Sequence, residues 1–308
     1  FLKISRFFDE PFADPSFVPT FFVAELARQT VTVALAGDGG DESFAGYEKY
    51  LTDDIEQRLR SKVPNSLRSV TPLLADLAAK LPGTVARKAN TLLRTLAVSP
   101  EQGFFLTNSF FCPVLWQKLI KPAFAKRLSG YDSASVTTSA YLKADTDDHL
   151  SKVIYTDFKT YLPGDILVKV DRMTMANSLE ARAPLLDYRI VEFAAKIPSA
   201  CKLKGKEKKY LLKQSQKNIL TDDILYRKKM GFSVPLAECL SRDLKTICDS
   251  LFLAKETGLA HFLDSKQIIL LWQQHQGGDY RYTQELWSML VFEAWWQHYM
   301  QPALPEAG

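Results

Sequence analysis

One β-branched run in an otherwise helical sequence constrains the fold of this chain most strongly. Residues 30–36 read Thr-Val-Thr-Val-Ala-Leu-Ala, a composition typical of a β-strand. The run follows residues 20–29, which have the apolar spacing of a short helix, and it ends at residues 37–42, Gly-Asp-Gly-Gly-Asp-Glu. A helical pattern resumes from about Ser43. The order helix, strand, glycine turn, helix predicts a parallel α/β unit.

The remainder of the sequence is helical in pattern. We expect helices over the ranges in which apolar residues recur every three or four positions, namely 51–63, 67–81, 114–128, 150–161, 166–179, 188–196, 209–220 and 285–300. The last of these ranges places Trp287, Leu290, Val291, Ala294, Trp295 and His298 on one face, which we expect to pack in the core.

The sequence shows no second convincing strand, and a lone parallel strand cannot satisfy its backbone N–H and C=O groups. The chain also begins at Phe1 rather than at a methionine. We therefore expect that partner strands lie upstream and that the chain is the C-terminal part of a longer protein. On this interpretation residues 1–60 are the remnant of the α/β unit, and residues 61–308 form a helical part.

The composition is that of a folded, soluble protein. Of the 308 residues, 46% are hydrophobic, and 39 Lys and Arg against 35 Asp and Glu leave a formal charge of +4. These values exclude a mainly disordered chain, and the charge is too small to indicate nucleic acid. No apolar run is long enough for a membrane span. Four scattered cysteines without a CxxC pair indicate a reducing compartment, so we expect a cytoplasmic protein.

The glycine turn is the first candidate functional motif. Ligands of α/β proteins bind beyond the carboxyl ends of the strands, where glycines let the backbone approach a ligand closely. Asp38, Asp41 and Glu42 would repel a bare phosphate, but they suit one that is bridged by Mg²⁺. The turn is neither a Walker A motif nor GxGxxG. It predicts a Mg-nucleotide loop or, equally well, an acidic cap of the next helix.

Two further blocks carry charges in unusual places. Residues 167–187 contain Lys169, Asp171, Arg172, Glu180, Arg182 and Asp187 in an otherwise apolar stretch. We favour a network of structural ion pairs over direct catalysis there, with Asp187 as a helix N-cap. Residues 226–235 join a cationic cluster to a Gly-Phe turn, and a solvated basic turn is favoured over a clamp for polyphosphate or a developing oxyanion. The lysine-rich run 202–209 is interpreted as a solvated face rather than a nucleic-acid site.

Together these blocks closely resemble one family, the synthetase half of glutamine-dependent asparagine synthetases. The family pattern LSGxGxDExFxGYxxY corresponds to Leu35–Tyr50, and KxDRxxMxxSLExRxPxLD corresponds to Lys169–Asp187. A third block, Lys209–Phe232, and the opening Asp9–Ser16 also match in order and spacing. The resemblance implies an adenine-nucleotide-hydrolase-like fold of the PP-loop ATP pyrophosphatase type, here truncated at its N-terminus and therefore mostly α with a remnant parallel α/β unit.

The resemblance also implies an activity. Members of the family use ATP and Mg²⁺ to convert the aspartate side-chain carboxyl into an acyl-adenylate, with release of pyrophosphate. Ammonia, made from glutamine in a separate N-terminal domain, then displaces AMP to give asparagine. The implied partners are thus aspartate and glutamine-derived ammonia, with neither nucleic acid nor a membrane involved.

Site residues follow from the aligned positions. Asp41 resembles the family's Mg²⁺-binding aspartate, and Asp38 replaces the carboxylate, usually Glu, that is proposed to handle the ammonia proton. Lys229 matches the lysine of the RxK motif, which stabilises the charged intermediate. Ala36 and Gly37 match the positions that line the ATP phosphates. Glu180 and Arg182 are expected to shape the interior rather than to react.

The sequence departs from the family pattern in three ways. Ala36 replaces a serine, and Asp38 is one methylene shorter than Glu, so acceptors other than aspartate, such as a sugar- or peptide-linked carboxylate, stay open. The SGGxDS pyrophosphate loop is absent from the chain, as is the glutaminase cysteine that follows the initiator Met. We therefore expect the chain alone to be inactive. A helical binding module that has lost the chemistry is the alternative, and an exposed sheet edge could pair two copies into a homodimer.

Overall fold

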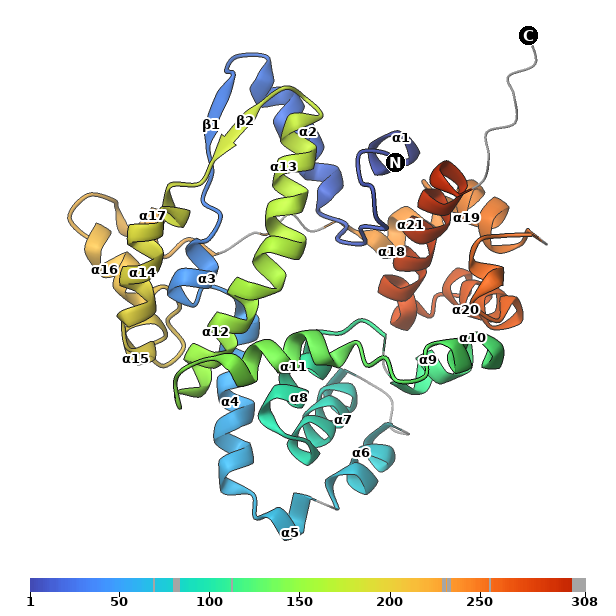
Figure 1. Cartoon of the computed structure of the whole chain (residues 1–308), viewed down its shortest axis with the longest axis horizontal. Helices are drawn as coiled ribbons and strands as arrows, with labels where there is room; N and C mark the ends of the chain where they lie inside the picture. Colours follow the sequence, from blue (N-terminus) through green and yellow to red (C-terminus); the bar gives the residue numbers. More distant parts are fainter. Residues whose placement is uncertain are drawn as a thin grey trace.

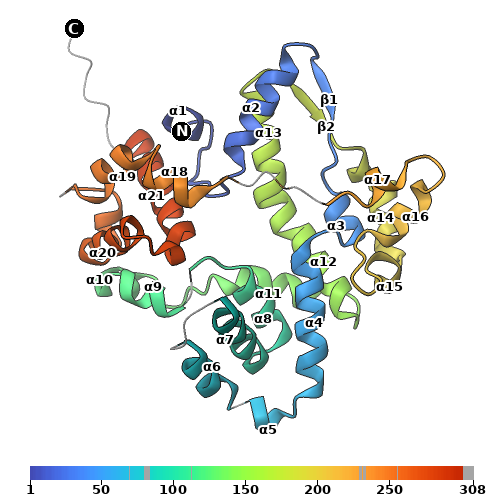
Figure 2. The same ribbon diagram turned by 180° about the vertical axis from the view of Figure 1, so that it is seen from behind.

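The computed structural model describes residues 1–68, 70–79, 84–111, 113–228, 231, 234–254 and 256–300. Helices dominate it, and a small sheet lies at one end of the molecule (Figures 1 and 2). The expectation of a mostly α chain with a parallel α/β unit is thus confirmed. None of the helices in the described ranges is both long and apolar enough to span a membrane.

The α-helices in chain order are α1 (Leu2–Ser5), α2 (Phe17–Arg28), α3 (Gly40–Phe44), α4 (Glu48–Lys62), α5 (Asn65–Arg68), α6 (Thr71–Ala79), α7 (Thr84–Ala97), α8 (Pro100–Thr107), α9 (Pro113–Leu119), α10 (Pro122–Arg127), α11 (Ala134–Lys143), α12 (His149–Lys159), α13 (Leu167–Met175), α14 (Tyr188–Lys196), α15 (Ser199–Lys202), α16 (Tyr210–Gln216), α17 (Asp222–Leu225), α18 (Leu236–Ser241), α19 (Lys245–Phe252), α20 (Ser265–Gln276) and α21 (Thr283–Tyr299). Short helical turns are η1, a π-helix (Leu162–Ile166), and the 3₁₀ turns η2 (Pro184–Leu186), η3 (Leu259–His261) and η4 (Tyr280–Tyr282). The helices that the apolar spacing predicts are confirmed, with shifts of a few residues at their ends and with two predicted ranges each split in two.

The sheet pairs two strands that are far apart in the sequence. β1 (Val33–Leu35) lies parallel to β2 (Glu180–Arg182), with Ala34 opposite Ala181. The Ala36 N–H donates to the Arg182 carbonyl oxygen at 2.7 Å and extends the ladder toward the glycine turn. The strand predicted over 30–36 is confirmed over its centre. The expectation of no second strand is wrong, because β2 owes its conformation to this pairing rather than to its own composition.

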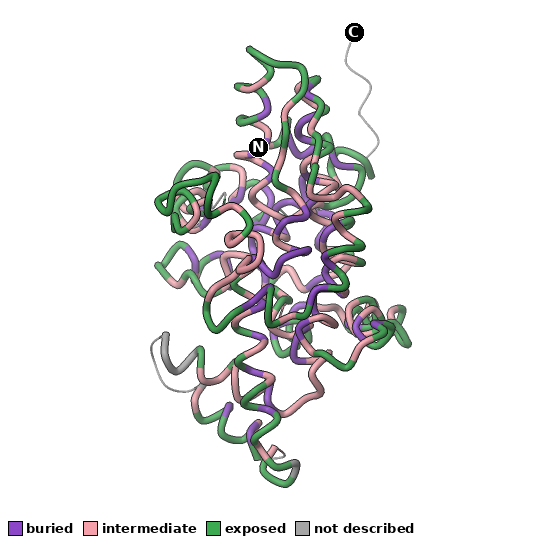
Figure 3. Tube along the Cα trace, turned by 90° about the vertical axis from the view of Figure 1, so that its left-hand side faces the viewer, coloured by how far each residue is buried: buried purple, intermediate pink, exposed green. Residues whose placement is uncertain are grey.

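The two faces of the sheet differ in their surroundings. On one face the small Ala34 and Ala181 are partly covered, and α13 contacts both β2 and α2 there. The other face is open, and Leu35 is 76% exposed. Figure 3 shows buried residues along the middle of the molecule and mainly exposed ones at the end that carries the strands. The expectation that Glu180 and Arg182 shape the interior is wrong, because both side chains are more than half exposed and pair with each other at 2.7 Å.

The C-terminal helix holds the N-terminal loop in place. The largest hydrophobic cluster combines side chains of α1 and α2 with those of α18 to α21. Within it, the Trp287 indole N–H donates to the Ala13 carbonyl oxygen at 2.8 Å, and that of Trp295 donates to the Asp9 carbonyl oxygen at 2.8 Å. The predicted core face of the last helix is confirmed, except that its last member, His298, is exposed. The loop that carries residues 9–16 is therefore anchored by two tryptophans of the C-terminal helix.

Candidate functional site

The glycine turn leads from β1 into α3 and rests on the second block. Gly39 has φ +82°, and a Cβ on it would overlap the Leu186 side chain. A Cβ on Gly40 would lie 2.7 Å from Leu185 Cδ1. The turn can therefore pack against η2 only because these two positions are glycine. The apolar end of the second block is the support on which the first block folds.

The three acids of the turn have different environments. Glu42 is only 1% exposed and accepts a hydrogen bond from the Tyr47 hydroxyl at 2.6 Å, while burial raises its pKa. Asp41 lies 3.0 Å from the Lys209 ammonium. Burial also raises the pKa of Asp38, with Lys169 opposing the shift and Asp41 adding to it. All three acids line one cavity, but Glu42 is almost fully buried and bonded to Tyr47, whereas Asp38 and Asp41 are more accessible to a ligand.

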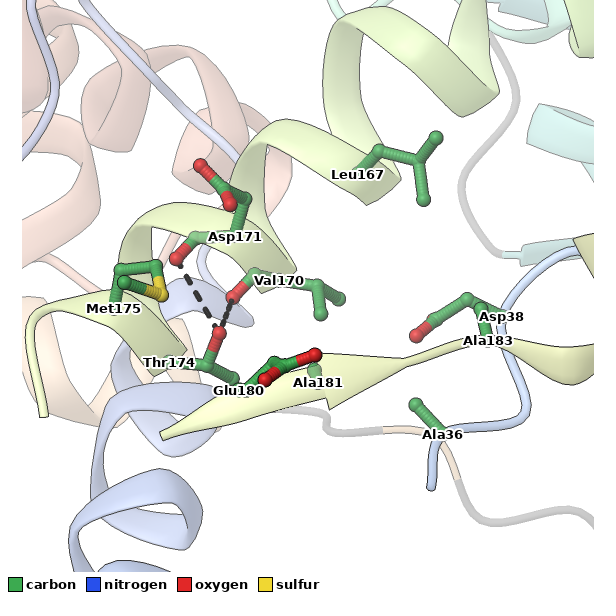
Figure 4. Close-up of a pocket in the computed structure, with 10 residues that line it drawn as sticks. All are labelled: Ala36, Asp38, Leu167, Val170, Asp171, Thr174, Met175, Glu180, Ala181 and Ala183. Atoms are coloured by element: carbon green, nitrogen blue, oxygen red, sulfur yellow. Dashed lines mark hydrogen bonds between the residues drawn. The ribbon is translucent and has the colours of Figure 1, made fainter. Parts of the chain in front are cut away.

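Two cavities meet at Asp38. The α2 cavity, about 360 Å³, lies between α2, α13 and β1, and its wall includes Lys169 and Asp41. The β2 cavity, about 290 Å³, lies between α13 and β2. Ala36 and Asp38 line both cavities. Figure 4 shows the Asp38 carboxylate directed into the space between α13 and the strands, whereas the Asp171 carboxylate points away from the strands. A carboxylate is thus placed where two small compartments join.

Two charges of the second block form ion pairs with the N-terminal loop. Lys169 donates to Asp14 at 2.6 Å, and Arg172 lies 3.2 Å from Asp9. Burial opposes ionisation of Asp14, but Lys169 and Ser16 outweigh it and lower the pKa of this acid. Asp187 accepts from the Arg189 backbone N–H and caps α14, as predicted. The interpretation of this block as a structural ion-pair network is confirmed for these residues.

The lysine-rich run contributes a cation to the glycine turn. Lys209 has φ +54°, a left-handed conformation that is uncommon outside glycine, and its ammonium contacts Asp41. Lys208 pairs with Glu48 on α4, and Lys202 is only 3% exposed. The interpretation of this run as a solvated face is therefore wrong for these three residues. The run folds back against the turn rather than projecting into solvent.

Comparison with known proteins decides the family. A family model described as asparagine synthase matches residues 1–297. The chain belongs to the asparagine synthase family. Over 293 residues, 95% of this chain, it is 31% identical to asparagine synthetase [glutamine-hydrolyzing] 1 of Bacillus subtilis (strain 168). Over 254 residues, 80% of the chain, it is 37% identical to asparagine synthetase [glutamine-hydrolyzing] 3 of the same organism.

A putative asparagine synthetase of Mycobacterium tuberculosis (strain ATCC 25618 / H37Rv) is 31% identical over 294 residues. The chain spans 44% of the length of the first Bacillus relative and 43% of the mycobacterial one. The fold is accordingly the PP-loop ATP pyrophosphatase type of the asparagine synthase family, and the expected family resemblance is confirmed.

The site residues inferred from the family motifs differ in what the structure says of them. Asp38, Asp41, Ala36 and Gly37 all line the α2 cavity. Lys229 lies outside the residues that the structure describes. Two cations lie beside these acids: Lys169, predicted only as part of an ion-pair network, lines the same cavity, and Lys209, predicted as part of a solvated face, contacts Asp41. Lys169 and Lys209 are each the first residue of a motif block, and this position is the sequence signal that could have identified them as site residues.

The acids of the turn fit Mg²⁺ by their chemistry. Mg²⁺ binds proteins through one or two carboxylates and completes its shell with water and phosphate oxygens. Asp41 and Asp38 offer two carboxylates on one turn, both on the wall of the α2 cavity. In the described part of the chain, no group of three or more His, Cys, Asp or Glu side chains is arranged for a metal. The donor set therefore fits an ion that shares its shell with phosphate oxygens.

Gly46 fixes the contact between Asp41 and Lys209. A Cβ at this buried position would overlap both Asp41 Oδ1 and Lys209 Cε. We expect Gly46→Ala to lower the free energy of unfolding by about 1–3 kcal/mol, because neither neighbour can move without losing this contact. Urea denaturation measures the loss. Gly164→Ala, where a Cβ meets nothing within 4 Å, is the matched control, and an equal loss in both variants would contradict the argument.

Asp165, in the π-turn η1, should make stability depend on pH. Burial, together with the neighbouring Asp14, raises its pKa to about 7, against an ordinary value of 3.8. Its contribution to stability is thus fully present below about pH 4 and is lost as the pH rises through 7. We expect Asp165→Asn to be more stable than the wild type by about 2 kcal/mol at pH 8 and by little at pH 4.

Urea denaturation of both proteins at the two pH values checks this expectation. The control is Asp171→Asn, which removes an exposed carboxylate from the adjoining helix α13. It should give no gain that grows with pH. The same difference between the Asp165 variant and the wild type at both pH values would show that Asp165 does not titrate in this range.

Proposed function

We propose that the chain carries the part of an ATP-dependent amide synthetase in which ammonia meets an activated carboxylate. The observation that supports this is the position of Asp38 at the junction of two cavities, on the same turn as Asp41. In the proposed reaction, the side-chain carboxylate of aspartate attacks the α-phosphorus of ATP and pyrophosphate leaves. Ammonia then adds to the acyl carbon of the adenylate, loses a proton, and AMP leaves to give asparagine.

Each site residue has one task in this proposal. Ala36 and Gly37 line the phosphates, with Ala36 offering its backbone because it lacks the hydroxyl of the family's serine. Asp41 would hold Mg²⁺, which when bound offsets the negative charge of the polyphosphate. Asp38 accepts the proton from the attacking amine, since its carboxylate faces both cavities. Lys229 stabilises the negative charge of the tetrahedral intermediate.

The environment of Asp38 suits a base. Burial raises its pKa from the ordinary value of 3.8. A general base works best when its pKa lies near the working pH, so this direction of shift favours proton transfer at neutral pH. The small side chains of Ala36 and Ala181 line both cavities and leave space beside Asp38 for a small amine. Lys169 lines one of the two cavities.

The test is pyrophosphate release by the full-length gene product with ATP, Mg²⁺, ammonia and aspartate. Release that requires aspartate and is lost in Lys229→Ala would support the proposal. Pyrophosphate release that requires a different carboxylic acid would support the amide-forming reaction but show that the acceptor is not aspartate. Failure to bind Mg-ATP would favour the alternative of a helical binding module. The 308-residue chain assayed by itself is expected to give no turnover, and a single turnover would refute that expectation.

A further inference from the structure

Helix α6 presents its large apolar residues to solvent and buries small ones. Thr71 and Ala75, one helical turn apart, are buried, whereas Leu73 and Leu77, also one turn apart, are 66% and 59% exposed. A row of exposed apolar side chains, here called the apolar tip, continues from α5 into α6 and comprises Leu67, Val70, Leu73, Leu74 and Leu77. Single exposed leucines are common on proteins, but a row of them indicates an interaction surface.

Polar contacts join α6 to its neighbour α7. The Asn90 side-chain amide of α7 donates to the Ala75 carbonyl oxygen of α6 at 2.6 Å. Arg94 of α7 pairs with Asp76 of α6 at 2.7 Å. The leucines of the apolar tip turn about half or more of their surface to solvent, so they contribute little to this packing. Their exposure is thus a property of a fixed helix pair.

The same part of the chain is strongly positive. Residues 58–97 contain eight Lys or Arg and a single acid, Asp76, which gives a formal charge of +7. The whole chain has +4, so the rest of it is net acidic. Lys62 at the end of α4 and Lys88 on α7 are exposed, and Asp76 is already paired with Arg94. Such a concentration of positive charge attracts an anionic partner.

The apolar tip lies far from the candidate site. Figures 1 and 2 show α5 and α6 at the end of the molecule opposite to β1 and β2. The cavities at Asp38 are lined by residues of α2, α13, the two strands and the segments that adjoin them, and none of their lining residues belongs to α5, α6 or α7. A partner bound at the apolar tip would therefore leave both cavities accessible.

The combination of leucines and cations matches the surface of an anionic bilayer. At such a surface, apolar side chains enter the boundary between headgroups and acyl chains, while Lys and Arg contact the anionic headgroups. Nucleic acid would match the charge but not the leucines. An uncharged protein surface would match the leucines but not the charge.

We propose that the apolar tip docks the protein peripherally on a membrane surface rich in anionic phospholipid. The leucines of α5 and α6 enter the headgroup region, and the basic residues of the segment 58–97 hold the protein there. The family resemblance implies no membrane partner, so the proposal goes beyond it. It is also independent of the proposed function, because it involves no residue of the candidate site.

The test is co-sedimentation of the full-length gene product with lipid vesicles. One set of vesicles contains phosphatidylcholine and phosphatidylglycerol, and the other contains phosphatidylcholine alone. We expect the affinity for the mixed vesicles to be higher by about tenfold or more, because only these attract the basic segment. Raising the salt from about 0.1 M to about 0.5 M should weaken this binding, since salt screens exposed charges.

Two double variants separate the apolar and the charged contribution. Leu73→Ser combined with Leu77→Ser should weaken binding to the mixed vesicles by about tenfold or more, because it removes apolar surface that would enter the lipid. Lys62→Glu combined with Lys88→Glu should weaken it by a similar factor, about tenfold, because it replaces attraction by repulsion. All four side chains are exposed, so the fold should be kept, and circular dichroism checks this.

The matched controls lie on α11, outside the apolar tip. Leu142→Ser replaces a leucine as exposed as Leu73, and Lys143→Glu replaces an exposed lysine. Neither should change the affinity for the mixed vesicles. A loss in the controls equal to that in the double variants would show that binding is not located at the apolar tip, and it would contradict the proposal.

Three other results would overturn the proposal. The first is a wild-type protein that does not bind the mixed vesicles, and the second is equal affinity for both kinds of vesicle. The third is self-association that the leucine double variant abolishes, without lipid binding, which would assign the apolar tip to a second copy of the chain. No measurement uses ATP, so these outcomes are distinct from failure of the proposed function, which the pyrophosphate assay reports.

Discussion

Replacing Lys49 by methionine is expected to lower the free energy of unfolding by about 3–5 kcal/mol. Lys49, on α4, lies 2.8 Å from Asp157 of α12, whose side chain is 3% exposed. Its ammonium is also 3.9 Å from the centre of the Tyr161 ring and 5.2 Å from that of Tyr47. Methionine leaves the Asp157 carboxylate buried without its cation. An uncompensated buried charge destabilises the folded state strongly.

Two further variants separate this cause from lost packing. Burial raises the pKa of Asp157 and Lys49 opposes that shift, so removing the lysine should raise the pKa of this acid further. The double variant with Asp157→Asn should therefore recover part of the loss, because it removes the stranded charge. Lys159→Met removes an exposed lysine that lies 5.7 Å from the Tyr155 ring, and it should cost less than about 1 kcal/mol.

Urea denaturation at pH 7 measures all three variants. If Lys49→Met lowered the free energy of unfolding no more than Lys159→Met, the buried pair would not be a source of stability.

The loss of Lys49 should also affect the candidate site. Tyr47 contacts the same ammonium and donates to Glu42 of the glycine turn, so the turn should be less rigid in this variant.

The local structure of this chain could be read from local signals. β1 was predicted because its β-branched run ends abruptly at a glycine turn. The helix over 188–196 was predicted with the ends that the structure gives, because Asp187 caps it and Pro198 follows it. The aromatic face of the last helix was predicted from its spacing. In each case the determining residues lie within a few positions of one another.

The long-range pairings could not be read in this way. β2 is Glu-Ala-Arg, and it becomes a strand only because residues 33–35, nearly 150 positions away, supply its partner. Lys169 and Asp14 are separated by 155 positions. Both charges are visible in the sequence, but their partnership is fixed by the packing of the loop against α13. The same holds for Asp41 and Lys209.

The direction of the Glu42 side chain could have been predicted from local sequence, but only with the correct start of helix α3. The sequence left open whether the three acids face a Mg-nucleotide or cap the next helix. In the structure α3 already begins at Gly40, so Asp41 and Glu42 are successive residues of a helix and point about 100° apart. Had the helix start been placed at Gly40 rather than near Ser43, this separation would have followed from helical geometry alone.

Replacing Asp38 by asparagine should reduce amide formation by the full-length gene product by about 10²- to 10⁴-fold, because it removes the base but keeps the shape of the side chain. Mg-ATP binding should change far less, since Asp41 and the glycine backbone are untouched. The structural grounds are the place of Asp38 at the meeting of the two cavities and the burial that raises its pKa. The measurement is kcat/KM for ammonia, followed by pyrophosphate release.

Asp38→Glu is the matched control, because it keeps the carboxylate and restores the residue that asparagine synthetases usually carry at this position. It should retain activity within about tenfold, since general-base catalysis depends on the carboxylate rather than on one methylene. The base acts when ionised, so activity should fall as the pH drops through the raised pKa of Asp38, above the range of an ordinary aspartate. Wild-type rates in Asp38→Asn would assign proton removal to water or to another group, and Asp38 would then be a shape-determining residue of the two cavities.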